Sequence, residues 1–377
     1  MSWANKQSKA FVILLRGLLV SFTLVGCAST PQIEEPTHLV WPPAPLQPRI
    51  QFVRSIVGEQ DLEQDTTFSQ EIMDFLTGIT PPPKHIAEPM GIAVSDDGQH
   101  LYVSNFRGYV FAFDFAKKTF TKIESLAYPS GLALDSDGHL HVVEQGKRQI
   151  SVFNETGKKL RSYLHPEMVR PTGIAIDRER NIIYVADTGH SDKSAKASGH
   201  NVKVFNQSGE LTGTIGKERG DQPGQFTFPT YLALDAKGNL YVTDTLNARI
   251  QVFSPNQEYL RSIGQRGNAW GMFDKPKGVA LDTFGNVYVA DSGWSNIQIF
   301  NPKGEVLLFF GGRGPLPGML KNPTAVAIDA TNHIYVADYI NHRINVYKLM
   351  NTSAEDSYID PTQVSEKPAV QEEKHKQ

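Results

Sequence analysis

Six segments of the chain repeat one pattern of apolar residues around a short polar turn, and this repetition constrains the fold more than any other feature. The copies are GIAVSDDGQHLYVSN from Gly91, GLALDSDGHLHVVEQ from Gly131, GIAIDRERNIIYVAD from Gly173, YLALDAKGNLYVTD from Tyr231, GVALDTFGNVYVAD from Gly278 and AVAIDATNHIYVAD from Ala325. They start 40, 42, 58, 47 and 47 residues apart, and each follows a proline by two residues. Such periods are typical of a propeller or another repeat array.

Within each copy the apolar residues alternate, which is the two-residue period of a β-strand. Val279 and Leu281 precede a turn, and Val287 and Val289 follow it. In the turns, aspartate and glycine favour a tight hairpin. A third strand such as RIQVF from Arg249 and a fourth such as YLRSIG from Tyr259 come next. Four antiparallel strands per repeat make one propeller blade. The sequence therefore predicts an all-β, six-bladed β-propeller.

The pattern resembles the NHL repeat over roughly residues 89–348. The segments YVTDTLNARIQVFS from Tyr241 and YVADYINHRINVYK from Tyr335 are similar to that family's consensus, and the linkers GDQPGQFTFP, GNAWGMFDKP and GPLPGMLKNP are similar to its connector between blades. The first two copies depart from it, because Asn105 and Glu144 replace the aspartate that ends the second strand elsewhere. The resemblance implies an NHL-type propeller.

The last repeat ends at Tyr347 after only three strands. Upstream of the first repeat, IQFVRSIVG from Ile50 is similar to the fourth-strand segment EYLRSIG from Glu258. We expect residues 50–58 to complete the last blade, which removes exposed sheet edges. The predicted organisation is a closing strand and a connecting helix in 49–88, propeller blades in 89–349 and a disordered tail in 350–377.

The chain begins with a short basic and then apolar segment, as a secretory signal does. Lys6, Lys9 and Arg16 accompany an apolar run that ends in Leu24-Val25-Gly26-Cys27. This ending resembles the bacterial lipoprotein signal, which implies that residues 1–26 are removed and that Cys27 is acylated. A conventional signal cut nearby is the alternative. Proline-rich residues 27–48 are expected to form a tether.

The lipoprotein resemblance also implies a location: the bacterial cell envelope, lipid-anchored and facing the periplasm. In a Gram-negative cell, Ala28 after the cysteine favours the outer membrane over the inner one. The expected partners are the membrane, through Cys27, and a protein, peptide or glycan ligand.

Charge and cysteine content exclude several classes of function. The chain has 37 basic and 40 acidic residues, and removal of residues 1–26 takes away three basic ones, which leaves a net charge of −6. Such a domain is a poor ligand for nucleic acid, so no nucleic-acid partner is expected. The single cysteine excludes an internal disulfide and a cysteine-rich metal centre.

In a propeller, the connectors into the innermost strands and the loops between second and third strands meet on one face, where a ligand site is expected. The candidate ligand-face residues are Arg107, Lys147, Arg148, Asp187, His190, His200, Lys277, Trp294 and His342. Asp187, Asp244, Asp291 and Asp338 recur once per blade, and could either bind a cation or accept hydrogen bonds from their own loops. Their repetition favours the second interpretation.

The third blade differs most from the others, because its loop between second and third strands has nine additional residues within GHSDKSAKASGH from Gly189. His190, Asp192 and His200 with Asp187 could hold a metal ion. The alternatives are a mobile loop and a contact with a partner.

Two functions of different classes remain open. In the first, the propeller is a non-catalytic scaffold for a ligand and uses no cofactor or metal. In the second, it is a metal-dependent lyase or hydrolase of the propeller type. No residue is assigned a catalytic role, because no recognised catalytic motif occurs in the sequence.

Overall fold

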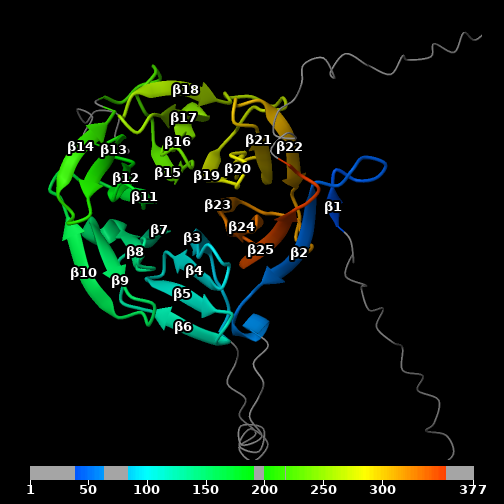
Figure 1. Ribbon diagram of the computed structural model, residues 1–377, viewed down its shortest axis with the longest axis horizontal. Helices are drawn as coiled ribbons and strands as arrows, with labels where there is room; N and C mark the ends of the chain where they lie inside the picture. Colours follow the sequence, from blue (N-terminus) through cyan, green and yellow to red (C-terminus); the bar gives the residue numbers. More distant parts are fainter. Residues whose placement is uncertain (1–38, 63–83, 191–198, 217, 354–377) are drawn as a thin grey trace, which may run out of the picture. The chain divides into compact units, whose positions relative to one another are not determined.

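The computed structural model describes residues 39–62, 84–190, 199–216 and 218–353. Their strands form six sheets arranged in a ring, which is a six-bladed β-propeller (Figure 1). The predicted signal, Cys27, residues 28–38 of the predicted tether, most of the connecting helix and nearly all of the tail lie outside these residues. Residues 39–48 of the predicted tether are described, and within them Val40–Trp41 form a short strand, β1, that pairs with the closing strand. Among the described residues, no helix has the length and apolar character needed to cross a membrane.

Each of the first three blades is a four-stranded antiparallel sheet with its first strand at the centre of the ring. Blade 1 contains β3 (Pro89–Val94), β4 (His100–Asn105), β5 (Tyr109–Asp114) and β6 (Thr119–Ile123). Blade 2 contains β7 (Pro129–Leu134), β8 (Leu140–Glu144), β9 (Gln149–Phe153) and β10 (Lys159–Leu164). Blade 3 contains β11 (Pro171–Asp177), β12 (Ile182–Asp187), β13 (Asn201–Asn206) and β14 (Leu211–Ile215).

The next blades follow the same order. Blade 4 contains β15 (Pro229–Leu234), β16 (Leu240–Asp244), β17 (Arg249–Phe253) and β18 (Tyr259–Ile263). Blade 5 contains β19 (Pro276–Leu281), β20 (Val287–Asp291), β21 (Asn296–Phe300) and β22 (Val306–Gly311). Three short 3-10 helices also occur in the described residues: η1 (Glu59–Leu62), η2 (Gln145–Lys147) and η3 (Thr245–Asn247).

Blade 6 joins distant parts of the chain. Its sheet has the order β1 (Val40–Trp41), β2 (Ile50–Ile56), β25 (Arg343–Leu349), β24 (His333–Asp338) and β23 (Pro323–Ile328). Ile50 pairs with Leu349, and Ile56 pairs with Ile344. The blue β2 therefore lies beside the red end of the chain in Figure 1. Edge strands are protected because the ring is closed by backbone hydrogen bonds.

The hydrophobic core lies between successive blades rather than at the centre of the ring. Second and third strands are buried along their whole length in several blades, as in β8, β9, β16 and β20. Outer strands such as β10 bury one residue in six, because one of their faces meets solvent.

The innermost strands approach one another closely at the repeated glycine. A side-chain carbon on Gly91 would lie 2.1 Å from the carbonyl oxygen of Ser130 on the next blade. Blade 4 carries Tyr231 instead, and its hydroxyl donates a hydrogen bond of 2.8 Å to the backbone oxygen of Met90 on the opposite blade. Tyr231 therefore crosses the central channel and packs against apolar residues on both sides.

Candidate functional site

We call the side formed by the connectors and the loops between second and third strands the connector face. We call the opposite side, formed by the remaining hairpin turns, the turn face. The residue that ends each second strand fixes the connector of its own blade. Asp244 accepts a hydrogen bond from the amide of Thr227 at 2.7 Å, and Asp338 accepts one from the amide of Lys321 at 2.7 Å. The pattern repeats in blade 5, where Asp291 accepts from two amides.

The recurrent aspartates also bind side chains of their own loops. Arg249 donates to Asp244 at 3.0 Å, and Arg343 donates to Asp338 at 3.3 Å. Burial raises the pKa of both carboxyl groups, and these hydrogen bonds oppose that effect. Since their oxygens are occupied by loop groups, the aspartates are structural and do not form a cation-binding ring.

The two blades that lack this aspartate keep the same clamp with different chemistry. Glu144 accepts a hydrogen bond from the amide of Ala127 at 2.9 Å, and Asn105 donates to the carbonyl oxygen of Ala87. Burial tends to raise the pKa of Glu144, but hydrogen bonds from Ser151, the Ala127 amide and Gln149 lower it overall. The departures from the repeat consensus therefore preserve the connector geometry.

Two residues expected on the ligand face, Asp187 and His200, lie beneath it. The carboxylate of Asp187 is fully buried and accepts hydrogen bonds from the amides of Val169, Arg170 and Gly189. His200 is 3% exposed. Its Nδ1 accepts a hydrogen bond from the amide of Phe228 at 3.2 Å, and its Nε2 lies 3.1 Å from the His190 carbonyl oxygen.

These contacts correct the assignment of Asp187 and His200 as ligand contacts. Both ring nitrogens of His200 are occupied, and burial lowers its pKa, which keeps the imidazole neutral. Neither residue has a free donor atom for a metal ion. The rest of the suggested metal set, Asp192, lies outside the described residues, while His190 is exposed beside a shallow pocket.

The other predicted residues divide between ion pairs and exposed loop positions. Arg107 pairs with Glu88 at 2.9 Å, and Lys147 pairs with Glu144 at 3.0 Å. The Nδ1 of His342 accepts a hydrogen bond from the amide of Glu88 at 3.0 Å. Arg148 lines the pocket beside His190, and Trp294 is 43% exposed. Arg107 and Lys147 are thus already neutralised by carboxylates.

The centre of the connector face holds a pocket of about 280 Å³ that sequence reasoning only partly located. Lys277 lines it, as expected for a ligand-face residue, but its main companions were not predicted. Its walls include Phe106, Gln145, Arg170, Phe228 and the channel-crossing Tyr231. Small hydroxyl residues complete it: Ser130, Thr172, Thr230 and Thr245.

The hydroxyl residues around this pocket mainly join neighbouring blades. Ser130 donates to the Thr172 carbonyl oxygen at 2.8 Å, and Thr245 donates to the Pro276 carbonyl oxygen at 2.9 Å. Thr324 similarly donates to the Pro89 carbonyl oxygen at 2.8 Å. These bonds fix the rim of the pocket, so its shape is set by the closed ring.

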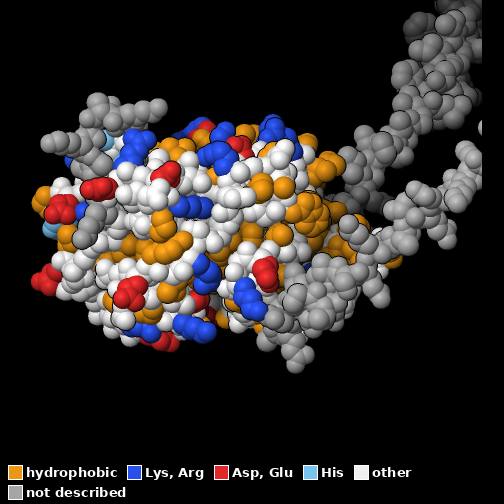
Figure 2. All heavy atoms as spheres, turned by 90° about the horizontal axis from the view of Figure 1, so that it is seen from above, with side chains coloured by type: hydrophobic (Ala, Val, Ile, Leu, Met, Phe, Trp, Pro, Cys, Tyr) orange, Lys and Arg blue, Asp and Glu red, His pale blue; other side chains and the backbone are white. Residues whose placement is uncertain are grey.

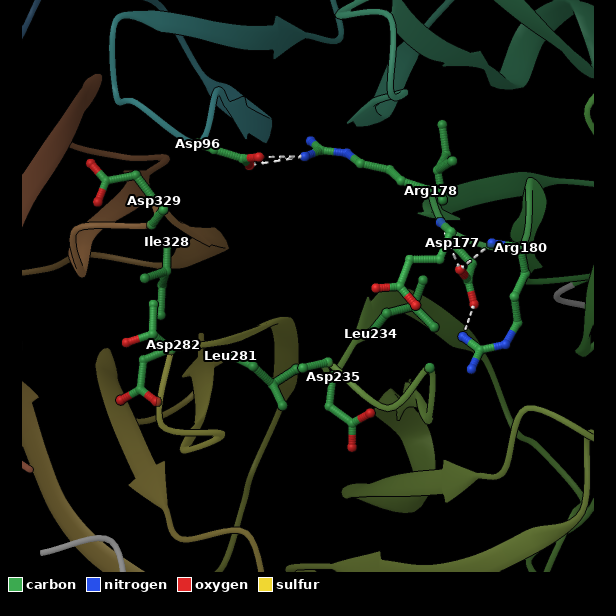
Figure 3. Close-up of a pocket in the computed structure, with 16 residues that line it drawn as sticks. Asp96, Asp177, Arg178, Arg180, Leu234, Asp235, Leu281, Asp282, Ile328 and Asp329 are labelled. Atoms are coloured by element: carbon green, nitrogen blue, oxygen red, sulfur yellow. Dashed lines mark hydrogen bonds and ion pairs between the residues drawn. The ribbon is translucent and has the colours of Figure 1, made fainter. Parts of the chain in front are cut away.

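The turn face has a larger hollow of about 460 Å³ at the other end of the channel. Figure 3 shows Arg178 extending across its mouth to Asp96, where both oxygens of the carboxylate are bound at 2.8 and 2.9 Å. Asp177 faces Arg180 at 2.9 Å in the same view. The lining carboxylates Asp177, Asp235, Asp282 and Asp329 close their own turns by accepting amide hydrogen bonds.

Among the described residues, one group of three potential metal ligands lies together: Asp135, Asp137 and His139 on the turn face. Asp135 accepts amide hydrogen bonds from Asp137 and His139, and its other oxygen contacts His139 at 3.2 Å and His141 at 3.1 Å. Asp329 makes the same contact with His333. This group is a repeated turn motif rather than a dedicated metal centre.

Comparison with known proteins supports the propeller fold. Residues 226–253 and 320–347 match the NHL repeat, and residues 73–189 match the SMP-30/Gluconolactonase/LRE-like region. The chain is an NHL-repeat β-propeller with a gluconolactonase-like region. The NHL propeller is 32% identical over 150 residues to peptidyl-glycine alpha-amidating monooxygenase of Mus musculus. This match covers 36% of the chain but only 14% of that relative.

Several solved structures share the fold of the NHL propeller. A streptogramin B lyase has a TM-score of 0.52 at 14% identity, with 72% of this chain and 95% of that one covered. A virginiamycin B lyase from Staphylococcus aureus has a TM-score of 0.51 at 16% identity, with 82% and 90% covered. A protein described as a putative gluconolactonase has a TM-score of 0.54 at 14% identity, with 70% and 89% covered.

Proposed function

We propose that the chain is a lipid-anchored protein of the bacterial envelope whose NHL propeller binds a protein partner on its connector face without catalysing a reaction. The distribution of exposed large apolar residues carries this proposal. Leu246, Trp294 and Ile340 lie in corresponding loops of three successive blades and are 49%, 43% and 42% exposed. We call these three residues the loop-tip patch. Tyr128 is also exposed on this face.

Trp270 and Leu316 are exposed in connector segments and so belong to the same face. The remaining exposed large apolar residues of the described chain are on outer strands (Val53, Leu160, Leu164, Tyr259, Leu260 and Phe309) and in the β1–β2 loop (Leu46). Apart from Leu46, none of these described residues lies in a hairpin turn of the turn face. Figure 2 shows the side of the ring, where hydrophobic side chains are interspersed with basic and acidic ones.

Aromatic and aliphatic anchors surrounded by charged residues are typical of the energetic centre of a protein interface. Arg266 donates to the Leu246 carbonyl oxygen at 2.8 Å, and Arg313 donates to the Gly293 carbonyl oxygen at 3.1 Å. Basic side chains thus lie beside the loop-tip patch, which supports a partner with an acidic surface.

Crosslinking in intact cells tests this proposal. A photoreactive amino acid in place of Trp294 is expected to yield one dominant partner, identified by mass spectrometry. The triple substitution of Leu246, Ile340 and Tyr128 by serine, made in that background, should reduce the yield at least tenfold. The matched control changes Leu160, Leu260 and Phe309 on outer strands to serine and should leave the yield unchanged. Equal yields from both variants would reject the connector face.

Membrane anchoring is tested separately. Cys27→Ser should abolish incorporation of radiolabelled palmitate and release the protein from the membrane fraction, because acylation requires the thiol. Continued labelling of the Cys27→Ser protein would contradict this part of the proposal.

A metal-dependent lyase or hydrolase is the second candidate, because the gluconolactonase-like match and several structural relatives point to enzymes. The described residues around the central pocket do not fit a divalent ion, since none of those that line it is a carboxylate or an imidazole and two are cationic. Metal analysis of the purified protein separates the candidates. A stoichiometric ion whose removal abolishes an activity would favour the enzyme.

A further inference from the structure

We infer that the central pocket of the connector face is a binding site for a carboxylate carried on an apolar group, with Arg170 and Lys277 as the residues that bind the anion. This inference deepens the proposed function, because it states what chemical group the partner presents. Only one part of the inference rests on the proposed function, namely that the carboxylate belongs to a protein partner.

Arg170 is the first element of this site. Its Nε and Nη2 atoms are buried and have no hydrogen-bond partner among the described residues. The guanidinium lies over the ring of Phe228, with Cζ 4.8 Å from the ring centroid. Buried N–H groups without a hydrogen-bond acceptor are costly, so an anion that accepts from these two nitrogens of the half-buried Arg170 would relieve an existing penalty.

The carboxylate whose charge acts on Arg170, that of Asp187, already has hydrogen-bond partners. Asp187 interacts with the charge of Arg170, but its oxygens accept the amide hydrogen bonds described above. Burial lowers the pKa of Arg170 in spite of Asp187. The guanidinium therefore has unused hydrogen-bonding capacity.

Lys277 is the second cation of the pocket. Its Nζ has one neutral partner, the Oδ1 of Asn322 at 3.2 Å, and no carboxylate among the described residues pairs with it. Burial lowers its pKa, and the charge of Lys275 lowers it further. A lysine ammonium without a counter-ion in a partly desolvated site is a ready receptor for an anion.

The walls of the pocket select the rest of the ligand. Met90, Phe106 and Phe228 provide apolar surface around the two cations. Phe228 is itself fixed by His200, because the Phe228 amide donates to His200 Nδ1. An anion attached to an aromatic or aliphatic body therefore fits this lining better than a small hydrated anion such as phosphate.

Binding of 4-fluorobenzoate to the purified full chain, followed by fluorine NMR, tests the site. The neutral isostere 4-fluorobenzamide should bind at least tenfold more weakly. Arg170→Gln and Lys277→Met should each weaken 4-fluorobenzoate binding at least tenfold. The matched variants Arg161→Gln and Lys321→Met change exposed cations outside the pocket and should leave the affinity unchanged. Equal binding of the acid and the amide, or unchanged binding by Lys277→Met, would overturn the inference.

Stability provides an independent readout. If the two cations lack counter-ions, Arg170→Gln and Lys277→Met should melt at the same temperature as the parent or higher. A melting temperature several degrees lower would instead indicate a structural role and overturn the assignment.

Competition tests whether the ligand needs an apolar body. We expect N-acetylphenylalanine to displace 4-fluorobenzoate, and phosphate and glucuronate not to displace it. Equal displacement by phosphate or glucuronate would overturn the requirement for an apolar body.

The two proposals fail separately. Substitution of the loop-tip patch by serine should leave 4-fluorobenzoate affinity unchanged, because these residues do not line the pocket. Loss of crosslinking with intact benzoate binding would therefore concern the protein partner alone. Failure to distinguish acid from amide, with crosslinking intact, would concern the carboxylate site alone.

Discussion

The hydroxyl of Tyr231 donates a hydrogen bond to the backbone oxygen of Met90, 2.8 Å away on the opposite blade. The Tyr231 side chain lines the central pocket of the connector face and does not line the hollow on the turn face. Burial raises the pKa of Tyr231 well above its ordinary value, so the hydroxyl retains its proton and remains a donor.

Tyr231→Phe should remove this cross-channel bond and leave the Met90 carbonyl oxygen without its partner. We expect the free energy of unfolding to fall by about 1 kcal/mol, the usual net contribution of a buried hydrogen bond. Urea denaturation followed by circular dichroism measures it. Tyr259→Phe is the control, because that hydroxyl bonds Ser262 at an exposed site. Equal effects of the two substitutions would show that the cross-channel bond adds nothing.

The base of the blade 3 insertion is closed by two glycines in contact. A side-chain carbon on Gly199, whose φ is +86°, would lie 2.2 Å from the Cα of Gly189. Gly199→Ala should therefore cost about 3 kcal/mol or more, from overpacking and from the left-handed backbone together. Gly138 has a φ of +77° but no atom within 4 Å, so Gly138→Ala isolates the backbone contribution of about 1 kcal/mol. Similar thermal unfolding of both variants would argue against the close contact.

Asp135 links stability to acid pH. Burial tends to raise its pKa, but hydrogen bonds from His141 and the His139 amide, with the charge of both histidines, lower it from 3.8 to about 2. A carboxyl group whose folded pKa is depressed stabilises the fold above its unfolded pKa, and this stabilisation is lost as pH falls from about 4 to about 2. Asp135→Asn should cost about 2 kcal/mol near neutral pH and converge with the parent near pH 2.

Denaturant titrations across this pH range, with Asp137→Asn as the exposed neighbouring control, check the prediction. A constant difference between parent and Asp135→Asn from pH 7 to pH 2 would show that ionisation of Asp135 is not the cause.

Deletion of residues 49–58 should abolish cooperative thermal unfolding, because β25 would lose its outer partner and the last blade would keep an open edge. The register Ile50–Leu349 to Ile56–Ile344 supplies the hydrogen bonds that are removed. Deletion of residues 28–37 is the control and should leave the melting curve unchanged. A sharp, unshifted transition in the 49–58 deletion would disprove a structural role for β2.

The architecture was predictable because it depends on repetition. Each blade has its own alternation of apolar and polar residues and its own turn, so a departure from the consensus in one copy does not change the predicted fold. Repetition also predicted that the aspartates that end the second strands accept hydrogen bonds from their own loops. It did not predict that Glu144 and Asn105 would reach the same connectors, because a longer or neutral side chain makes the contact with different atoms.

The central pocket was only partly predictable. Lys277 directly follows the proline that begins an innermost strand, a position that the propeller prediction places on the ligand face. Arg170 directly precedes such a proline, and no other blade has an arginine there. Its contact with Phe228 depends on how neighbouring connectors pack around His200. Tyr231 occupies a position that holds glycine in four of the other five copies, but the sequence could not predict its partner, which lies 141 residues away in the chain. Such contacts follow from closure of the ring rather than from local sequence.

The shared blade also sets the order in which the molecule can be completed. Among the described strands, β1 and β2 are synthesised first and β25 last, yet β2 and β25 pair with each other. A chain that stops before β25 keeps unpaired strand edges at both ends, and these are open to proteases and to aggregation. Blade 6 can therefore close only after synthesis has passed Leu349, when β25 becomes available to pair with β2.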